Sequence, residues 1–501
     1  MSQPQSPQKN RLLQWFVTNT VLTGIFALLW LLLRSGTKPN RLAYPCQQAA
    51  FTTASLAFGA PLVAALVTAR NLALALLGSR RALATAGIGL FVTIGLWGFL
   101  SQSNATTGRT YPLAPPADYR AEVFHVTDCP QDPVGDRFVG LDNLLRLMGR
   151  EGLKFYQSPT VTPLSGPDGI IGSEDVVVIK INYQWTGCGG TNTDLLRGLI
   201  RALVDHPDGF TGEVVVGENT QSISSDNLDR RGNNAQDHSL SPARVVAGFQ
   251  DLGHRVEVSD WTRFRKYRTE ANLSCDIGGS GYVVMEPGPA GKVSYPRFKT
   301  SSGSCVSIKN GVWDAGTGSF DRSRLKIINL PVLKPHGNVY GVTAAVKNYM
   351  GLVTNELNTG SHSAVRGGLM GAVMAETGPP DLNILDCIRV DGDPYAGPDV
   401  SWTHADRLDQ LVASTDPIAL DIWATSNILV PAFLANGHEP PWPNPSADPD
   451  DPNSTFRNYL DNSMDQLLAG GYEVTNDLES IDVHWWDGVE APRRSTGRVG
   501  N

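Results

Sequence analysis

The hydrophobic pattern in the second half of the chain predicts strands that are buried on both faces. Leu325–Leu330 is a short, mostly apolar segment with β-branched residues and too little alternation for a half-exposed strand, which favours a buried strand of a parallel sheet over a helix. Pro331 ends this strand, and the apolar positions over Val342–Met350 then fit a helix after a Gly337-Asn338 turn. Similar runs predict further strands at Glu174–Ile181, Glu213–Gly217, Arg255–Val258, Leu382–Val390 and Ile481–Trp486.

Helical patterns alternate with these strands, which is typical of an α/β fold. Asn182–Arg201 is a polar, glycine-rich turn that runs into an amphipathic helix, and Thr193-Asp194 is a plausible cap at its start. With the strands on either side it makes a βαβ unit, whose connection should be right-handed. Further helices are predicted over Leu141–Met148, Pro242–Leu252, Gly367–Glu376, Leu411–Ile428 and Phe456–Leu468.

Two stretches break this alternation. Residues 259–323 combine glycines and aromatics without a clean period, which indicates a β-rich insertion, and residues 102–135 are rich in Pro, Ser and Thr, as linkers are. The predicted fold class is therefore α/β, with a mostly parallel sheet, crossover helices and a β-rich insertion. It occupies a soluble domain over 136–501, with its core over 170–430, and an N-terminal transmembrane helical region over 1–101 precedes it.

Three uncharged apolar segments lie near the start of the chain, at residues 12–33, 49–69 and 82–101. Each is long enough to cross a bilayer, so we predict about three transmembrane helices and a multi-pass membrane protein. The second is the weakest, with a surface-lying or re-entrant segment as its alternative. A removable signal peptide is the alternative for the first, although no small-residue cleavage site follows promptly. Residues 102–119 hold one cation, Arg109, which favours an outer, periplasmic or extracellular, location for the soluble domain.

Charge and cysteine content exclude several classes of function. The 501 residues carry a formal net charge of −8 with no basic block, which argues against a nucleic-acid partner. The six cysteines include no CxxC pair, so neither an iron–sulfur cluster nor a structural zinc site has its usual ligand spacing. An even number of cysteines permits disulfides in an oxidising compartment, and their pairing stays open.

Polar side chains follow several of the predicted strands: Lys180 and Asn182, then Glu218, then Lys334 and His336, then Asp391. Because parallel strands bring their carboxyl ends to one edge of a sheet, we expect these groups to converge there. A single lysine at a strand end is usually solvated. Three lysines in otherwise apolar segments, Lys180, Lys334 and Lys347, favour an anionic ligand such as a carboxylate or phosphate. Histidine titrates near neutral pH and could act as acid or base. The predicted catalytic residues are His336, Lys334 and Lys180, and the predicted substrate-binding residues are Asn182, Lys347, Asn348 and Glu218.

Two other kinds of site stay open at this edge. Glu218, Asp391, Asp416 and Asp421, with His336, could hold a divalent metal such as Mg²⁺, Mn²⁺ or Ca²⁺, and Asp391 and Asp416 are the predicted ligands. Asp416 stands before Pro417, however, and a helix cap is its alternative role. The Gly187–Gly190 turn could bind an anion through backbone amides, with Cys188 as a nucleophile, a disulfide partner or an inert thiol.

Several blocks of residues in order resemble the family of the domain of unknown function 362. They are Val177–Asn182, Val216–Glu218, Ile328–Pro331 with Lys334 and His336, Val346–Leu352, and Ser414–Ala419 with Asp421. The resemblance spans about residues 170–430 and implies an α/β domain of mostly unassigned activity. Relatives often carry ferredoxin-type cysteine clusters. This sequence has none, so the resemblance brings neither an iron–sulfur cofactor nor an electron-transfer role with it.

Two functions of different classes fit these observations. The first is a membrane-anchored enzyme acting on a small anionic substrate, in which the three lysines hold the anion, His336 is the acid/base, and Glu218 or Asp391 is its partner or a metal ligand. The second is a sensor or scaffold module, tethered to the membrane, that binds an anion or a partner protein without chemistry. The second hypothesis predicts ligand binding with no product formed and tolerance of substitutions at His336.

Overall fold

The computed structural model describes residues 26–30, 116, 118–129, 136–221, 227–232, 234–400, 405–442, 447–486 and 493–496. The chain divides into two compact units, Met1–Tyr111 and Pro112–Asn501. Of the three predicted transmembrane segments, only Phe26–Trp30 lies within the described residues, and it is helical. Elsewhere in the described part, one stretch, Pro417–Ala435, is long and apolar enough to cross a membrane, and 67% of it is buried inside the protein, as a core helix would be.

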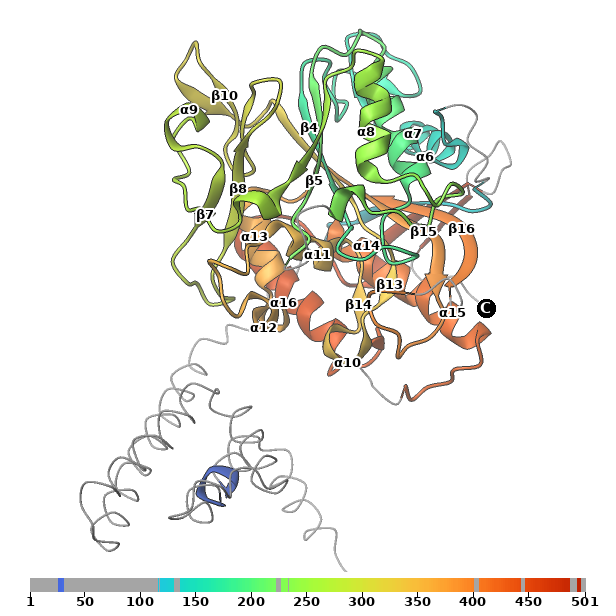
Figure 1. Ribbon diagram of the computed structural model, residues 1–501. Coiled ribbons are helices and arrows are strands. Elements are labelled where there is room, and N and C mark those ends of the chain that lie inside the picture. The colour runs from blue at the N-terminus through green and yellow to red at the C-terminus, as the bar shows by residue number, and fades with distance from the viewer. Residues whose placement is uncertain are drawn as a thin grey trace, which may run out of the picture. The chain divides into compact units, whose positions relative to one another are not determined.

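A nine-stranded sheet forms the centre of the second unit (Figure 1), in the order β18-β17-β1-β16-β15-β12-β4-β5-β6. The strands β15, β12, β4, β5 and β6 run parallel, β1 pairs with β17 in parallel, and β16 joins the two groups by antiparallel pairing on both sides. The sheet is thus mixed and mostly parallel, as predicted. Its strands are β1 (Ala121–Val126), β4 (Val176–Ile181), β5 (Glu213–Glu218), β6 (Val256–Asp260), β12 (Leu325–Leu330), β15 (Leu382–Asp391), β16 (Ala405–Ser414), β17 (Ile481–Trp486) and β18 (Arg493–Thr496).

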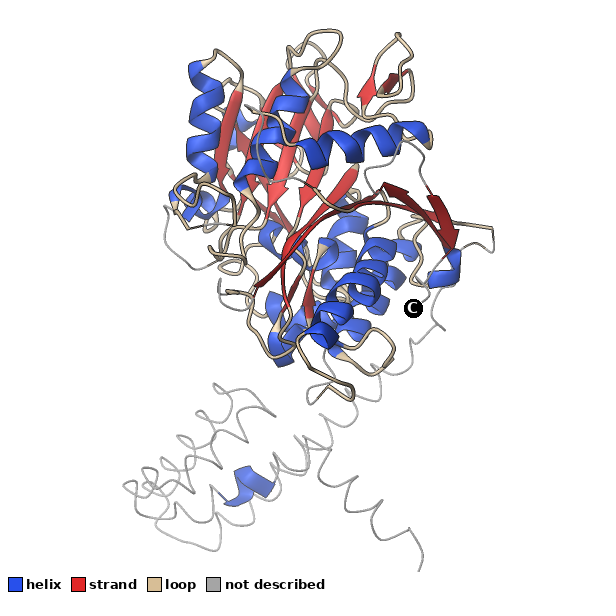
Figure 2. Ribbon diagram, turned by 90° about the vertical axis from the view of Figure 1, so that its right-hand side faces the viewer, coloured by secondary structure: helices blue, strands red, loops and turns tan. Residues whose placement is uncertain are grey.

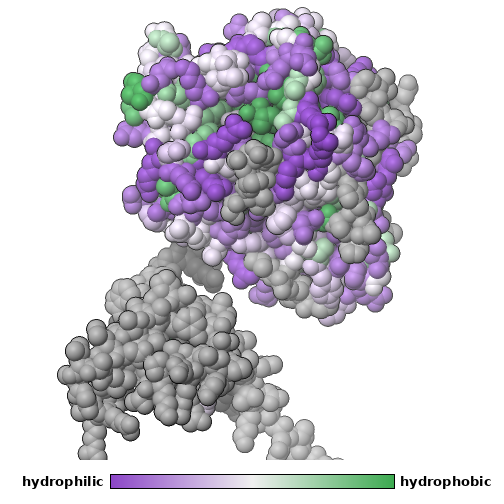
Figure 3. Space-filling model, viewed as in Figure 1, coloured by the Kyte–Doolittle hydropathy of each residue, from purple (hydrophilic) through white to green (hydrophobic). Residues whose placement is uncertain are grey.

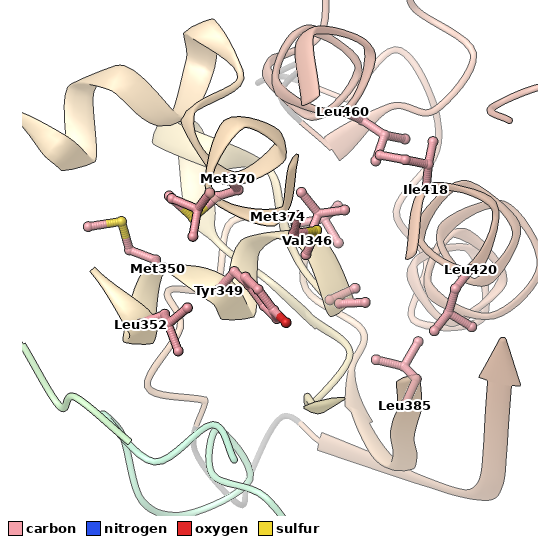
Figure 4. Close-up of a cluster of buried hydrophobic side chains, with 14 of the residues drawn as sticks. Val346, Tyr349, Met350, Leu352, Met370, Met374, Leu385, Ile418, Leu420 and Leu460 are labelled. Atoms are coloured by element: carbon pink, nitrogen blue, oxygen red, sulfur yellow. The ribbon is translucent and has the colours of Figure 1, made fainter. Parts of the chain in front are cut away.

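Helices cover both faces of this sheet (Figure 2). One face packs against α6 (Val139–Arg150), α7 (Thr193–Val204) and α8 (Pro242–Asp251). The other face packs against α11 (Ala345–Asn348), α13 (Leu369–Thr377), α14 (Pro417–Ala424) and α16 (Thr455–Ala469). Figure 4 shows the second core, where Val346 and Tyr349 lie among side chains from α13, α14 and α16.

The alternation of side chains along β4 decides which face receives its lysine. Val177, Ile179 and Ile181 belong to the core beneath α6, α7 and α8, whereas Val176 and Val178 belong to the core on the α11 side. Successive residues of a strand point to opposite faces, so Lys180 projects to the α11 side, in step with Val178. Burying each of these Val and Ile side chains contributes roughly 1.5–3 kcal/mol, which holds the register that aims Lys180.

The stretch predicted to be a β-rich insertion holds a separate five-stranded antiparallel sheet, in the order β11-β10-β9-β8-β7. A disulfide between Cys275 and Cys305 joins α9 (Cys275–Gly278) to this sheet, and Cys129, Cys188 and Cys387 are free and buried. The strands are β7 (Gly281–Val284), β8 (Ser294–Lys299), β9 (Cys305–Ser307), β10 (Gly311–Asp314) and β11 (Ser319–Asp321).

Shorter elements complete the unit. They are β2 (Tyr156–Gln157), β3 (Ser165–Gly166), β13 (Lys334–Pro335), α10 (Gly337–Tyr340), β14 (Val342–Thr343), α12 (Ser361–Ala364) and α15 (Val430–Ala435). A 3-10 turn over Tyr349–Leu352 follows α11, and a π-helical turn over Thr425–Leu429 joins α14 to α15. The space-filling view shows a mostly hydrophilic described surface on one face, with apolar residues in small patches (Figure 3).

Five local predictions differ from the structure. Residues 121–126 of the predicted linker form β1, because they pair with β16 and β17. Leu411–Ser414 was predicted to be helical but is the end of β16, because it pairs with both β15 and β1; the helix begins only at Pro417. The predicted helix over Val342–Met350 is divided between β14, α11 and the 3-10 turn. The Gly337-Asn338 turn is the start of α10. The cap of α7 is Asn192, whose side chain accepts hydrogen bonds from the amides of Asp194 and Leu195.

Candidate functional site

A buried ion pair joins the ends of two neighbouring parallel strands. Lys180 Nζ on β4 lies 2.6 Å from Glu218 Oε2 on β5, and both side chains are almost fully buried. Burial lowers the pKa of Lys180, and burial raises the pKa of Glu218 to about 7. The two pKa shifts move toward each other, so burial reduces the free energy that favours the charged pair over the neutral pair.

The hydrogen bonds of Lys180 use all of its donors. Besides Glu218, its Nζ donates to the backbone carbonyl of Ile181 at 2.7 Å and to Asn348 Oδ1 at 3.4 Å. A lysine ammonium has three N–H groups, so Lys180 has none left for a ligand. Lys180 thus lies at the strand ends as expected, where it contributes charge and rigidity to the site and has no free donor.

A chain of buried asparagines connects the strand ends. Asn182 Nδ2 donates to Asn348 Oδ1 at 2.9 Å, Asn348 Nδ2 donates to Asn329 Oδ1 at 2.8 Å, and Asn329 Nδ2 donates to Asn383 Oδ1 at 2.9 Å. Buried amides that are mutually hydrogen-bonded hold one another in fixed rotamers. Asn182 and Asn348 were predicted site residues, whereas Asn329 and Asn383 were missed; each is a polar residue inside an apolar strand, which is the signal that could have revealed them.

Lys334 lies on β13, past the end of β12, and is also buried. Its Nζ donates to Asn182 Oδ1 at 3.0 Å and to the carbonyl oxygen of Gly189. Burial lowers the pKa of Lys334 to about 7, and the neighbouring charge of Lys347 adds to this shift. These two hydrogen bonds leave one N–H group of the protonated Lys334 available to a ligand. The Gly187–Gly190 turn gives Lys334 a carbonyl acceptor, and burial raises the pKa of the Cys188 thiol in it to about 12.

Lys347 differs from the other two lysines in its hydrogen bonding. Its Nζ forms no hydrogen bond with any residue of the described chain and lies 4.7 Å from the centre of the Tyr340 ring. The side chain is only 5% exposed. Burial lowers the pKa of Lys347 to about 7, the charge of Lys180 lowers it further, and Glu218 opposes the shift.

Asp421 fixes the short helix that carries Lys347 and Asn348. From α14, its two carboxylate oxygens accept hydrogen bonds from the backbone amides of Ala345 at 2.7 Å and Val346 at 2.9 Å. These are first-turn amides of α11, which lack partners within the helix. Asp421 was considered as a metal ligand, but its oxygens serve this cap, and burial raises its pKa to about 8.

His336 stands beside the lysines with one ring nitrogen available. Its Nδ1 lies 2.6 Å from Thr343 Oγ1, and its ring packs edge-on against Tyr340 with centroids 5.1 Å apart. No described residue hydrogen-bonds to its Nε2. Burial lowers the pKa of His336 well below its ordinary value, and the charges of Lys347 and Lys334 add to this, so the ring is neutral at pH 7.

These groups line a common pocket. The pocket is narrow. Its volume of about 30 Å³ has room for roughly two water molecules. Its walls include Asn182, Glu218, Lys334, His336, Lys347 and Asn348. A larger cavity of about 570 Å³ lies elsewhere, beside Trp313, Phe320 and Tyr472, and no predicted site residue lines it. The charged and polar side chains lie at the smaller pocket because the strand ends that carry them converge there.

The two predicted metal ligands do not line this pocket. Asp416 caps α14, where its Oδ1 accepts hydrogen bonds from the backbone amides of Ile418 at 2.8 Å and Ala419 at 3.0 Å. A helix cap was the alternative role predicted for Asp416. Asp391 accepts the amide of Asp393 at 2.8 Å. Within the described residues, no group of three or more His, Cys, Asp or Glu side chains is arranged to hold a metal ion. A divalent metal stays a prediction.

A buried aspartate that sequence reasoning missed lies closer to the site. Asp386, inside β15, accepts hydrogen bonds from the Asn192 amide at 2.9 Å and from Asn234 Nδ2 at 3.3 Å. Burial raises its pKa to about 6, and the charge of Lys334 opposes this shift. The start of α7 is thus occupied by the protein's own carboxylate. An aspartate within an otherwise apolar strand was the available signal.

Comparison with known proteins gives one match. The family model described as "Domain of unknown function (DUF362)" matches residues 324–426, which include β12, Lys334, His336, Lys347 and Asp421. No curated protein and no solved structure matches the chain.

Proposed function

The chain belongs, over residues 324–426, to the family of the domain of unknown function 362, and from that premise we propose that it is an enzyme acting on a small anionic substrate bound in the lysine pocket. The observation that carries this proposal is the charge imbalance of the pocket. Lys180, Lys334 and Lys347 line or adjoin it, and Glu218 is the one carboxylate among its described lining residues. A buried excess of cations is costly unless an anion compensates it.

The available donors indicate how the anion is held. One N–H of Lys334, the amine of Lys347 and the buried Nε1 of Trp185 are donors of this pocket that form no hydrogen bond with a described residue. A carboxylate or phosphate oxygen would restore the hydrogen bonds and the charge of these groups. The narrow space favours a ligand of a few heavy atoms, or the anionic end of a longer one.

His336 supplies the chemical function in this proposal. A neutral imidazole whose Nδ1 contacts Thr343 keeps Nε2 in a fixed orientation, where it can accept and return a proton. The cations around it hold it neutral, so it accepts a proton when an anion enters and offsets their charge. This dependence on the anion links binding to proton transfer.

The location of the domain is part of the proposal. The Cys275–Cys305 disulfide favours an oxidising compartment, which agrees with an outer, periplasmic or extracellular, side of the membrane. The apolar segments at residues 12–33, 49–69 and 82–101 would anchor the domain there as a multi-pass protein.

Thermal unfolding of the detergent-solubilised full chain tests the binding proposal. Sulfate, acetate and phosphate at millimolar concentration should raise the melting temperature of the wild type. A Lys334→Met/Lys347→Met double variant should lose this shift, whereas Lys326→Met, at the other end of β12, should keep it. An equal anion shift in the double variant and the wild type would refute binding at this pocket.

Proton NMR of small carboxylates and phosphate esters incubated with the chain tests whether chemistry follows. A change in one compound that depends on His336, and is absent in His336→Gln, would establish an enzyme. Anion binding that His336→Gln leaves intact, with every compound unchanged, would favour the sensor or scaffold function instead.

A further inference from the structure

The three lysines at the pocket differ in how many of their donors the protein uses. Lys180 Nζ makes three hydrogen bonds, Lys334 Nζ makes two, and Lys347 Nζ makes none with the described residues. A charged ammonium buried without acceptors is costly, whereas a neutral amine needs far less compensation. The absence of hydrogen bonds at its Nζ therefore distinguishes Lys347 as the lysine whose nitrogen lone pair is free to react.

The surroundings of Lys347 lower its pKa to about 7, so a large fraction of the amine is neutral at neutral pH. Burial and the charge of Lys180 lower its pKa, and Glu218, already paired with Lys180, opposes this only in part. The Tyr340 ring face favours the cation, but by less than the usual cost of an uncompensated buried charge. The titratable or charged groups around it are Lys180 on β4, Glu218 on β5, Lys334 on β13, His336, Tyr340 on α10 and His362 on α12.

We propose that Lys347 is a nucleophile that forms an imine with the carbonyl carbon of a small 2-oxo acid. This inference rests on the proposed function, because the same pocket holds the carboxylate. A desolvated lysine beside another cationic group is the arrangement that activates an amine toward carbonyl compounds. The remaining N–H of Lys334 is placed to bind the carboxylate, and the narrow pocket restricts the substrate to a short chain.

The step balances with groups that line the pocket. The Lys347 nitrogen adds to the carbonyl carbon, and the carbonyl oxygen takes the proton that the nitrogen loses, which gives a carbinolamine. The carbon–oxygen bond then breaks, the oxygen takes the second proton of the nitrogen and leaves as water, and a carbon–nitrogen double bond remains. His336 Nε2 is suited to carry the proton between nitrogen and oxygen, because His336 and Lys347 both pack against the Tyr340 ring.

Reductive trapping tests this inference directly. The full chain is incubated with glyoxylate or pyruvate and sodium cyanoborohydride, which reduces an imine to a stable amine, and the label on each lysine is quantified by peptide mass spectrometry. We expect Lys347 to be labelled at least tenfold faster than Lys326, which is partly exposed and lies outside the pocket. Sulfate should suppress the label on Lys347 and leave that on Lys326 unchanged.

A Lys347→Arg variant separates this inference from the proposed function. Arginine keeps the cation but forms no such imine, so the variant should lose trapping at position 347 while it retains a melting-temperature shift with sulfate. Labelling of Lys347 no faster than Lys326, or labelling of Lys334 in its place, would overturn the inference while the sulfate shift preserved the proposed function. Loss of the sulfate shift in the wild type would overturn both.

Discussion

At the scale of single residues, the buried amine of Lys347 should lower the free energy of unfolding at neutral pH. The folded-state pKa of about 7 lies below the value near 10.4 of an unfolded chain, so the unfolded state binds the proton more tightly. Between about pH 7 and pH 10 the wild type should therefore gain stability as pH rises. Lys347→Met removes the titrating group and keeps the side chain's volume.

We expect Lys347→Met to be more stable than the wild type by about 1–3 kcal/mol at pH 7, with the difference shrinking toward pH 10. Thermal melts at a series of pH values measure this. Lys326→Met, near the start of β12 and away from the pocket, is the control and should show no such pH dependence. A lower melting temperature for Lys347→Met at pH 7 would contradict the buried, uncompensated amine.

If the pocket binds an anion as proposed, Lys334 and Lys347 should set the pH dependence of binding. Lys334 and Lys347 both have a pKa near 7 in the unliganded pocket, and an anion binds best when they are protonated. Sulfate keeps its charge across this range, so its affinity should be greatest below about pH 7. Above that, it should fall by up to about tenfold per pH unit for each lysine that must gain a proton. Calorimetric titration from pH 6 to 9 measures the slope, and a flat profile would show that neither lysine titrates with binding.

At the scale of elements, the close approach of two segments requires a glycine. Gly351, in the 3-10 turn after α11, faces the Lys180–Glu218 pair so closely that a Cβ there would lie within 3.0 Å of both side chains. Backbone and side chains on β4 and β5 leave the pair little room to move, because both residues are buried.

Gly351→Ala should therefore displace the ion pair and weaken sulfate binding at least tenfold, while the fold persists. Gly367→Ala is the matched control, since a Cβ at Gly367 would meet no atom within 4 Å. Calorimetry reports the affinity and circular dichroism the fold. If both variants bind sulfate as the wild type does, the Lys180–Glu218 geometry is not needed for the site.

Elements with a strong local signal could be predicted from the sequence. Leu325–Leu330 was predicted with the bounds it has in the structure, because a short apolar run between a charged segment and a proline has few alternatives. Leu411–Ser414 was misassigned because the same apolar residues continue into a real helix, and only pairing with β15 and β1 distinguishes the strand. Periodicity cannot show a partner strand.

The sequence indicated which side chains gather at the strand ends, but not how their hydrogen-bonding groups are used. Parallel strand ends brought Lys180, Lys334 and Asn182 together as expected, since that convergence depends only on strand direction. Which lysine keeps free donors depends on single acceptors such as the Gly189 carbonyl. Those contacts arise from loops whose conformation no residue pattern specifies.

At the scale of the whole molecule, distant segments complete the sheet. Ala121–Val126 lies in the stretch predicted to be a linker, yet it forms β1 and pairs in parallel with β17 at residues 481–486. Such pairing across most of the chain leaves no local signature. The insertion sheet also reaches the site, because Tyr282 on β7 accepts a hydrogen bond from Asn219, a residue of the pocket wall, at 2.8 Å.

The disulfide of the insertion should matter for stability more than for the pocket. Cys275 and Cys305 are 30 residues apart, and closing a loop of that length in the unfolded chain contributes about 3–4 kcal/mol in the chain-entropy account. A Cys275→Ser/Cys305→Ser variant should therefore melt at a lower temperature than the wild type. It should still bind sulfate within about threefold at temperatures where it is folded, because the lysines lie on the other sheet and past its strand ends.

A reducing agent provides the control for this prediction. It should lower the melting temperature of the wild type and leave that of the double variant unchanged, since the variant has no bond at these positions to reduce. Equal melting temperatures for the oxidised wild type and the double variant would contradict a stabilising disulfide. A large loss of sulfate affinity in the folded variant would show instead that the insertion shapes the pocket through contacts such as that between Tyr282 and Asn219.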